Sequence, residues 1–245
     1  MSTKATWRGG NLHFYDSGTH ERTSMVAPVS FYDDFLTPSL VIPAVGALES
    51  GVPWAKKIVS ANATVAAVAN ETNGAIQCAL AANVEKEDAG LCFADQKVFS
   101  ALQGLIFEAR VKVSVLPTLH AEAVWGVTSN WADGPDNITY SAFFTADGSG
   151  EIFCEKDDNA TDQSATSGVT VTNAQWKIYR IDFTNIADVK FFIDGNAVAT
   201  GTTFGWAANA ANSKVQPYLG LYKVGDDAGV GTIQVDYVRL SQNRS

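Results

Sequence analysis

The chain of 245 residues has few cysteines and no long run of apolar residues. Its three cysteines, Cys78, Cys92 and Cys154, are an odd number without metal-binding spacing. We expect buried free thiols in a protein made in a reducing cytoplasm, with a single Cys78–Cys92 disulfide as the alternative. No stretch approaches the ~18 consecutive apolar residues of a membrane-spanning helix, so we expect no membrane partner. Residues 1–24 are polar, and no export signal is readable in them.

Charged residues are also scarce, and the positive ones are outnumbered. They make up 18% of the chain, with 17 basic against 26 acidic residues and a formal net charge of −9. Proteins that bind DNA or RNA gain most of their affinity by neutralising phosphates with lysine and arginine. The basic residues show no cluster beyond the Lys56–Lys57 pair. We therefore expect no nucleic-acid partner.

The residue patterns of metal and cofactor sites are missing too. The histidines His13, His20 and His120 are scattered, without zinc-ligand spacing. No nucleophile elbow, phosphate-binding loop or dinucleotide-binding glycine motif occurs. Oxygen-bearing residues gather at 131–137 and at 157–159, where calcium is an alternative. Asp and Asn are also the common turn formers, so we predict no metal and no cofactor.

Short segments of alternating character fill most of the chain. Leu105 to Val113 alternates apolar residues with Ile106, Glu108, Arg110 and Lys112, which is typical of a half-buried antiparallel strand. Further strands are predicted at 74–80, 89–93, 121–127, 137–144, 150–155, 168–172, 176–183, 188–193, 217–222 and 231–240. Turn residues recur between them and no long helix is indicated. The pattern predicts an all-β antiparallel sandwich.

The first part of the chain differs from the rest. Residues 1–28 are polar and contain one strand-like piece at 11–15, which predicts an extended N-terminal arm. From residue 29 onward the apolar content rises, and we predict a single sandwich domain over 29–245. Residues 56–70 are rich in alanine and valine, and their β-branched residues favour two strands over a helix.

Three segments resemble the concanavalin A-like lectin/glucanase superfamily, which includes laminin-G-like domains. They are Phe107–Lys112, Trp176–Gly195 and Val235–Leu240, which are similar to a central strand, a hairpin and the terminal strand of family-16 glucanases. The resemblance implies a jelly-roll sandwich. Asp236, in the last of these segments, is expected to pair with an arginine on a neighbouring strand. The superfamily includes lectins, hydrolases and viral coat proteins, so the resemblance says little about function.

Catalysis in the glucanases depends on two carboxylates that this sequence does not place on the matching strand. Retaining enzymes need them about 5 Å apart. The resemblance puts them on the strand after the tryptophan-containing one, and 137–144 has no carboxylate. The next strand has Glu151 and Glu155 on one face, with Phe153 in place of an aspartate. We interpret that strand as an exposed acidic edge and predict no catalytic residue and no enzyme activity.

Three other segments resemble laminin-G-like domains of tailed-bacteriophage virion proteins: 31–35, 53–57 and 133–139. This resemblance implies a decoration or minor capsid protein that cements the capsid surface. Its expected partners are the major capsid protein and copies of itself, as a homotrimer or homodimer, in a virion assembled in the host cytoplasm. The alternative is a carbohydrate-binding or receptor-binding tail module. In that case a glycan would stack on exposed aromatic residues among Trp125, Trp131, Trp206 and Tyr222.

Overall fold

A computed structural model describes residues 3–8, 11–16, 22–24, 29–36, 42–44, 52–132, 134–172, 174–207, 209, 213–225 and 228–244. These residues form strands and two short 3-10 helices, and they contain no α-helix. The prediction of an all-β fold is confirmed. No helix in this part of the chain is long and apolar enough to cross a membrane.

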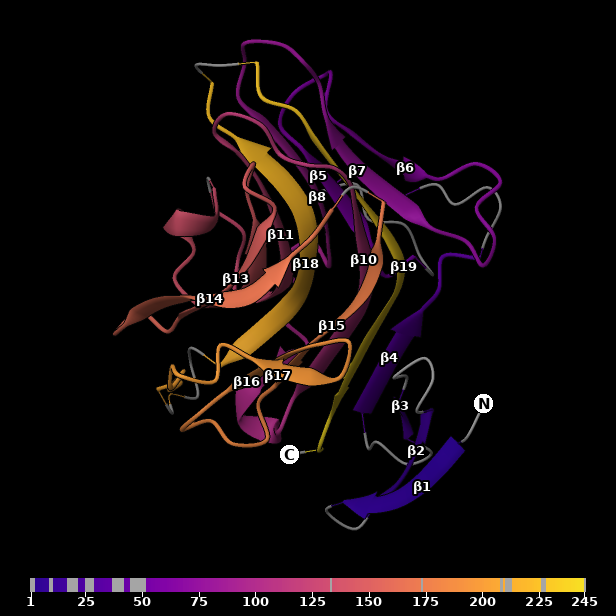
Figure 1. The fold of residues 1–245 in the computed structure, drawn as a ribbon, viewed down its shortest axis with the longest axis vertical. Coiled ribbons are helices and arrows are strands. Elements are labelled where there is room, and N and C mark those ends of the chain that lie inside the picture. The colour runs from indigo at the N-terminus through magenta and orange to yellow at the C-terminus, as the bar shows by residue number, and fades with distance from the viewer. Residues whose placement is uncertain are drawn as a thin grey trace.

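Two antiparallel sheets pack face to face into a sandwich (Figure 1). One, called the β10 sheet here, has the strand order β17-β16-β15-β10-β19-β7-β6, with β4 also pairing with β19. Its strands are β17 (Asn196–Val198), β16 (Lys190–Ile193), β15 (Trp176–Asp182), β10 (Ile106–Val115), β19 (Gly231–Gln242), β7 (Ile76–Leu80), β6 (Thr64–Ala67) and β4 (Val29–Asp33).

The other, called the β11 sheet, has the strand order β14-β13-β12-β11-β18-β8-β5, with β9 pairing with β18. Its strands are β14 (Asp162–Thr170), β13 (Glu151–Asp157), β12 (Ser141–Ala146), β11 (Ala121–Thr128), β18 (Lys214–Lys223), β8 (Glu87–Cys92), β5 (Ala55–Ile58) and β9 (Phe99–Ser100). The 3-10 helices are η1 (Ala101–Gln103) and η2 (Pro135–Asn137).

The core fills the space between the sheets, as the alternation in the sequence predicts. On β10, Phe107, Ala109, Val111 and Val113 are buried in this core, and the charged residues between them lie on the outer face. On that outer face, Arg110 forms an ion pair with Asp236 of β19, which confirms the expected partner of Asp236.

Most strand boundaries differ from the predictions by one to three residues, and two strands differ by more. The strand expected at 137–144 begins at Ser141, because Pro135 opens a 3-10 turn that occupies the preceding residues. The strand expected at 168–172 is longer and starts at Asp162, although its sequence has little apolar character. It is an edge strand held by its pairing with β13, so tertiary pairing outweighs a weak local signal. The two strands expected within 56–70 are present as β5 and β6.

The N-terminal segment holds three strands, where the sequence indicated one. They are β1 (Thr3–Arg8), β2 (Asn11–Asp16) and β3 (Arg22–Ser24), which pair only with one another as a small antiparallel sheet. In Figure 1 this sheet lies below β4, at the end of the molecule where the chain also terminates. The predicted division into an arm of residues 1–28 and a sandwich of residues 29–245 stays a prediction, and its boundary falls at residues 25–28, outside the described residues.

The three cysteines are free and buried, as expected. Burial raises the pKa of the Cys92 thiol to about 11 and that of Cys154 to about 12. These thiols are therefore protonated at neutral pH and chemically inert.

Candidate functional site

The β11 sheet is curved, and its outer side is the concave side of the ribbon (Figure 1). Figure 1 shows β18 bowed away from β10 and β19 at its ends, with η2 on the concave side. Alternate residues of the strands face this side, because their neighbours in the sequence belong to the core between the sheets. Some of the chain's charged and aromatic side chains lie on this face, where they form two groups.

The first group covers the centre of this concave side. Trp131 and Ile138 come from the loop between β11 and β12, and they pack on Val124, Phe143 and Tyr218 of the sheet. The Trp131 ring stacks on that of Tyr218 at 3.6 Å between centroids, with 5° between their planes. A second, smaller apolar core therefore holds the loop on the sheet.

Asp88, on β8, fixes this loop. Its carboxylate accepts hydrogen bonds from the Tyr218 hydroxyl at 2.8 Å and from Trp131 Nε1, and Lys57 Nζ lies 3.5 Å away. Burial raises the pKa of Asp88, and Lys57 opposes this rise. With its oxygens occupied by these donors, Asp88 holds the loop in place and is not available to a ligand.

The second group lies beside the loop, on β11, β12 and β13. Strand register pairs Thr145 with Val124 of β11 and Phe153 of β13, so that Glu122 and Glu155, two positions along from these partners, are its diagonal neighbours. Thr145 Oγ1 donates to Glu155 Oε1 at 3.2 Å and is also hydrogen-bonded to Glu122. The Ser164 hydroxyl of β14 donates to the same Glu155 oxygen at 3.2 Å. Two carboxyl groups thus converge on one buried hydroxyl.

Burial is the main cause of a raised pKa in both carboxyl groups. The pKa of Glu122 rises to about 8, with the charges of Glu155 and Asp136 adding to the effect of burial. The pKa of Glu155 also rises, although hydrogen bonds from Ser164 and Thr145 oppose the rise. With a pKa of about 8, Glu122 is mostly protonated at neutral pH. The two carboxyl groups interact, so they titrate as a coupled pair.

Half-buried aromatic rings border these carboxyl groups. Phe153 lies opposite Thr145 on β13, and Tyr222 lies opposite Glu122 on β18. We call the set the acidic trough: Glu122, Thr145, Phe153, Glu155, Ser164 and Tyr222. None of these six residues is basic. A cation, Lys86, lies over the ring of Tyr222, with its Nζ 5.9 Å from the ring centroid. Apolar rings beside carboxyl and hydroxyl groups suit a polyhydroxylated ligand.

The structure changes the interpretation of the residues considered from the sequence. Glu151 is hydrogen-bonded by Thr166 and does not share the hydroxyl between Glu122 and Glu155. Trp125 and Trp206 are buried in the core and Trp131 is covered, so only Tyr222 of the four aromatic residues lines the trough. Glu122 was missed. The available signal was a single charge at an outward position of the otherwise apolar strand 121–127.

Of the two segments considered for calcium, 157–159 uses its carboxylate oxygens in bonds within the protein. Asp158 accepts bonds from the amides of Ala160, Thr161 and Ala207, and it pairs with Lys156 at 3.1 Å. Asp133 lies outside the described residues. The described part of the chain contains no group of three or more His, Cys, Asp or Glu residues arranged to hold a metal ion.

Comparisons with known proteins identify the architecture. No family model and no curated protein sequence matches the chain. A protein of unknown function from Shewanella oneidensis MR-1 is similar in structure at 14% identity and a TM-score of 0.57, over 88% of this chain and 89% of that one. A putative β-glucanase from Mycobacterium abscessus has 18% identity and a TM-score of 0.53, over 86% and 98%. A variant of alginate lyase A1-II′ has 15% identity and a TM-score of 0.51, over 76% and 85%.

At these identities the similarity establishes the fold, a glucanase-like jelly roll. The fold expected from the resemblance is therefore confirmed. The prediction that the chain is not an enzyme is contradicted, because similar structures include enzymes such as the alginate lyase. The strand expected to hold two carboxylates has none, but the fold brings Glu122 and Glu155 from two other strands to the hydroxyl of Thr145.

Proposed function

We propose that this protein is a carbohydrate-active protein that binds a polysaccharide in the acidic trough and cleaves it by acid catalysis. The observation that carries the proposal is the chain of hydrogen bonds from Glu122 through Thr145 to Glu155. Glycoside hydrolysis needs one carboxylic acid that is protonated at working pH and one carboxylate. The names of the similar glucanase and lyase structures support a polysaccharide as the ligand.

Each carboxyl group has a defined role in the proposed reaction. Glu122 gives its proton to the glycosidic oxygen as the bond from that oxygen to the anomeric carbon breaks. Glu155 stays ionised and stabilises the positive charge that develops on the sugar ring, or directs the attacking water. Phe153 offers an apolar surface to a sugar face, and Ser164 and Tyr222 offer hydroxyl groups.

The charge of the trough favours a neutral polysaccharide. Glu155 is the carboxylate of the proposed pair, and the negative charge of Asp136 acts on both glutamates. A polyuronate such as alginate would place further carboxylates against this field in a partly desolvated site. A neutral β-glucan avoids that repulsion.

Binding and cleavage can be tested with laminarin and lichenan as neutral polymers and alginate as the anionic one. We expect the protein to bind a neutral polymer and to release reducing ends from it slowly. Glu122→Gln should release none, and Phe153→Ala should bind the polymer at least about tenfold more weakly. Glu151→Gln is the matched control, because Glu151 lies on the same strand outside the trough. Absence of both binding and release for all neutral polymers would overturn the proposal.

A structural role in a bacteriophage coat is the second candidate. The observation that favours it is the β1–β3 sheet, which pairs with no strand of the sandwich in the described residues. A sheet of three short strands has little stability alone, so it suits docking against another subunit or shell. The major capsid protein, further copies of this chain and the virion location remain part of this proposal. Counting copies per particle by quantitative gel tests it: hundreds fit a coat protein, and a handful fit a tail module.

A further inference from the structure

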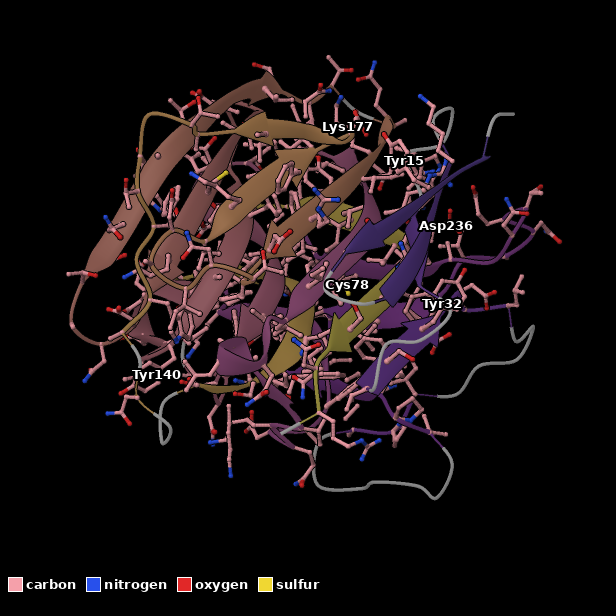
Figure 2. All side chains as sticks on the ribbon, turned by 90° about the horizontal axis from the view of Figure 1, so that it is seen from below. Tyr15, Tyr32, Cys78, Tyr140, Lys177 and Asp236 are labelled. Atoms are coloured by element: carbon pink, nitrogen blue, oxygen red, sulfur yellow. The ribbon has the colours of Figure 1, made fainter. Side chains whose placement is uncertain are left out.

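An open pocket lies at the opposite end of the β11 sheet from the acidic trough. It forms where the chain leaves β11 and enters β12 and β18, and its lining includes Lys97, Asn130, Trp131, Asn137, Tyr140 and Lys214. Glu122 and Asn130 stand at the two ends of β11, roughly 25 Å apart at the usual rise of a strand. Figure 2 places Tyr140 at the rim of the molecule, far across it from Tyr15 of β2. The pocket therefore lies away from the arm and from Glu122, and η2 stands between the pocket and the trough, with Asn137 in the pocket lining and Asp136 close to the two glutamates.

The charge of this pocket is opposite to that of the chain as a whole. The described residues of its lining include two lysines and no carboxylate, in a protein with a formal net charge of −9. Other lysines of the described residues form ion pairs, namely Lys57, Lys156, Lys177, Lys190 and Lys223. Lys97 and Lys214 have no carboxylate partner among the described residues, and both are exposed.

The nearby carboxylate of Asp95 is already engaged. Its Oδ1 accepts from the Gln216 side-chain amide at 2.7 Å and from the Trp131 backbone amide at 3.1 Å. It therefore fixes the wall of the pocket, while the two ammonium groups remain available at the opening. Two unpaired cations at one concave site attract an anion.

The remaining lining side chains fit the rest of a sugar ring. Asn130 and Asn137 carry amides that both donate and accept hydrogen bonds, as sugar hydroxyls do. The half-buried Tyr140 contributes aromatic surface to the same wall, and the covered Trp131 forms its base. Lysines are point charges without the fork of arginine, so the pocket does not select between a carboxylate and a sulfate.

We propose that this pocket binds a saccharide unit that carries a carboxylate or sulfate group. Lys97 and Lys214 contact the oxyanion, and the asparagines and aromatic rings contact the sugar ring. This site is independent of the trough, and its existence does not rest on the function proposed there.

Titration of the ¹⁵N-labelled protein, followed by NMR, tests this assignment with glucuronate, galactose 6-sulfate, glucose and a hexa-aspartate peptide as probes. We expect the two anionic sugars to shift the amide signals of Asn130, Asn137 and Lys214. Glucose should need an at least about tenfold higher concentration to cause the same shifts. Lys97→Ala and Lys214→Ala should each weaken the binding of the anionic sugars about tenfold, and added salt should weaken this binding further.

Two controls separate this site from other effects. Lys112→Ala, on the outer face of the β10 sheet, should leave the binding unchanged, and so should Phe153→Ala in the trough. Equal binding of glucose and glucuronate would overturn the proposal, as would binding that survives loss of both lysines. Binding of the acidic peptide without binding of the sugars would also overturn it and would indicate a protein partner instead.

Discussion

At the scale of single residues, the trough depends on the protonation of Glu122. Burial and the neighbouring negative charges raise its pKa from 4.5 to about 8. At pH values between these two pKa values, Glu122 holds a proton in the folded protein and releases it in the unfolded chain. The free energy of unfolding therefore falls as the pH rises through this window. Burial also raises the pKa of Glu155 and Asp88, which acts in the same direction.

We therefore expect the melting temperature of the wild type to fall between pH 5 and pH 8. Glu122→Gln should flatten this decline and raise stability at pH 8 relative to wild type, on the order of 1 kcal/mol or more. Thermal unfolding at several pH values measures it. Glu71→Gln, in the turn before β7, serves as the control and should leave the decline unchanged. An unaltered slope in Glu122→Gln would show that this carboxyl is ionised in the folded protein.

Two glycines give the ring of Tyr218 its place on the sheet. A Cβ added at Gly90 would lie 2.4 Å from the Tyr218 hydroxyl, and one at Gly220 would lie 2.6 Å from the Ala89 carbonyl oxygen. Both distances are too short for a side chain to fit without displacing its neighbour. The absence of side chains at these positions therefore allows Tyr218 to reach Asp88.

Gly90→Ala should push Tyr218 off Asp88 and loosen the loop that Trp131 anchors. We expect a loss of about 1–3 kcal/mol in the free energy of unfolding, as in other overpacked sites. Denaturant unfolding measures the loss. Gly201→Ala is the matched control, because a Cβ there meets nothing within 4 Å, and its stability should stay close to that of wild type.

At the scale of elements, buried lysines attach turns to the strands of the β11 sheet. Lys223, at the end of β18, is fully buried and donates to the carbonyl oxygens of Ala81, Asn83 and Gly229. Its Nζ also lies 3.4 Å from Glu87 of β8, which is equally buried. One ammonium group thus holds two turns next to the end of β18 and the start of β8, where these two strands pair.

Lys223→Met should cost about 3–5 kcal/mol, because it leaves Glu87 buried without a counter-charge and three carbonyls without a donor. The double variant Lys223→Met/Glu87→Gln should recover part of this loss, since it removes the uncompensated charge. Chemical denaturation of the four proteins in the cycle gives the coupling energy. Strictly additive losses would mean that the two side chains do not interact.

At the scale of the whole molecule, the sandwich contains the buried core, and the small N-terminal sheet pairs with none of its strands in the described residues. Deletion of residues 1–28 should therefore leave the sandwich folded, with a melting temperature within a few degrees of the full chain. Circular dichroism and thermal unfolding check this. A truncated chain that fails to fold would show that the arm belongs to the sandwich domain.

The sequence by itself determined the fold class and the approximate positions of most strands along the chain. Alternation at 105–113 placed five apolar side chains in the core, and the three glucanase-like segments indicated the jelly roll. The pairing of Asp236 with an arginine and the free state of the cysteines were also predictable. These features follow from a period of two along a strand and from the cost of burying charge, which are local properties.

Only the tertiary structure decided which side chains share a site. Glu122 and Glu155 are 33 positions apart in the sequence, and antiparallel register across β12 brings both to Thr145. The lysines of the anionic pocket, Lys97 and Lys214, are also distant in sequence and meet where β9 pairs with β18. Whether an aromatic residue such as Trp125 is a binding surface or part of the core likewise depended on the second sheet. Register and sheet packing are set by contacts between distant segments, which the periodicity of one strand does not encode.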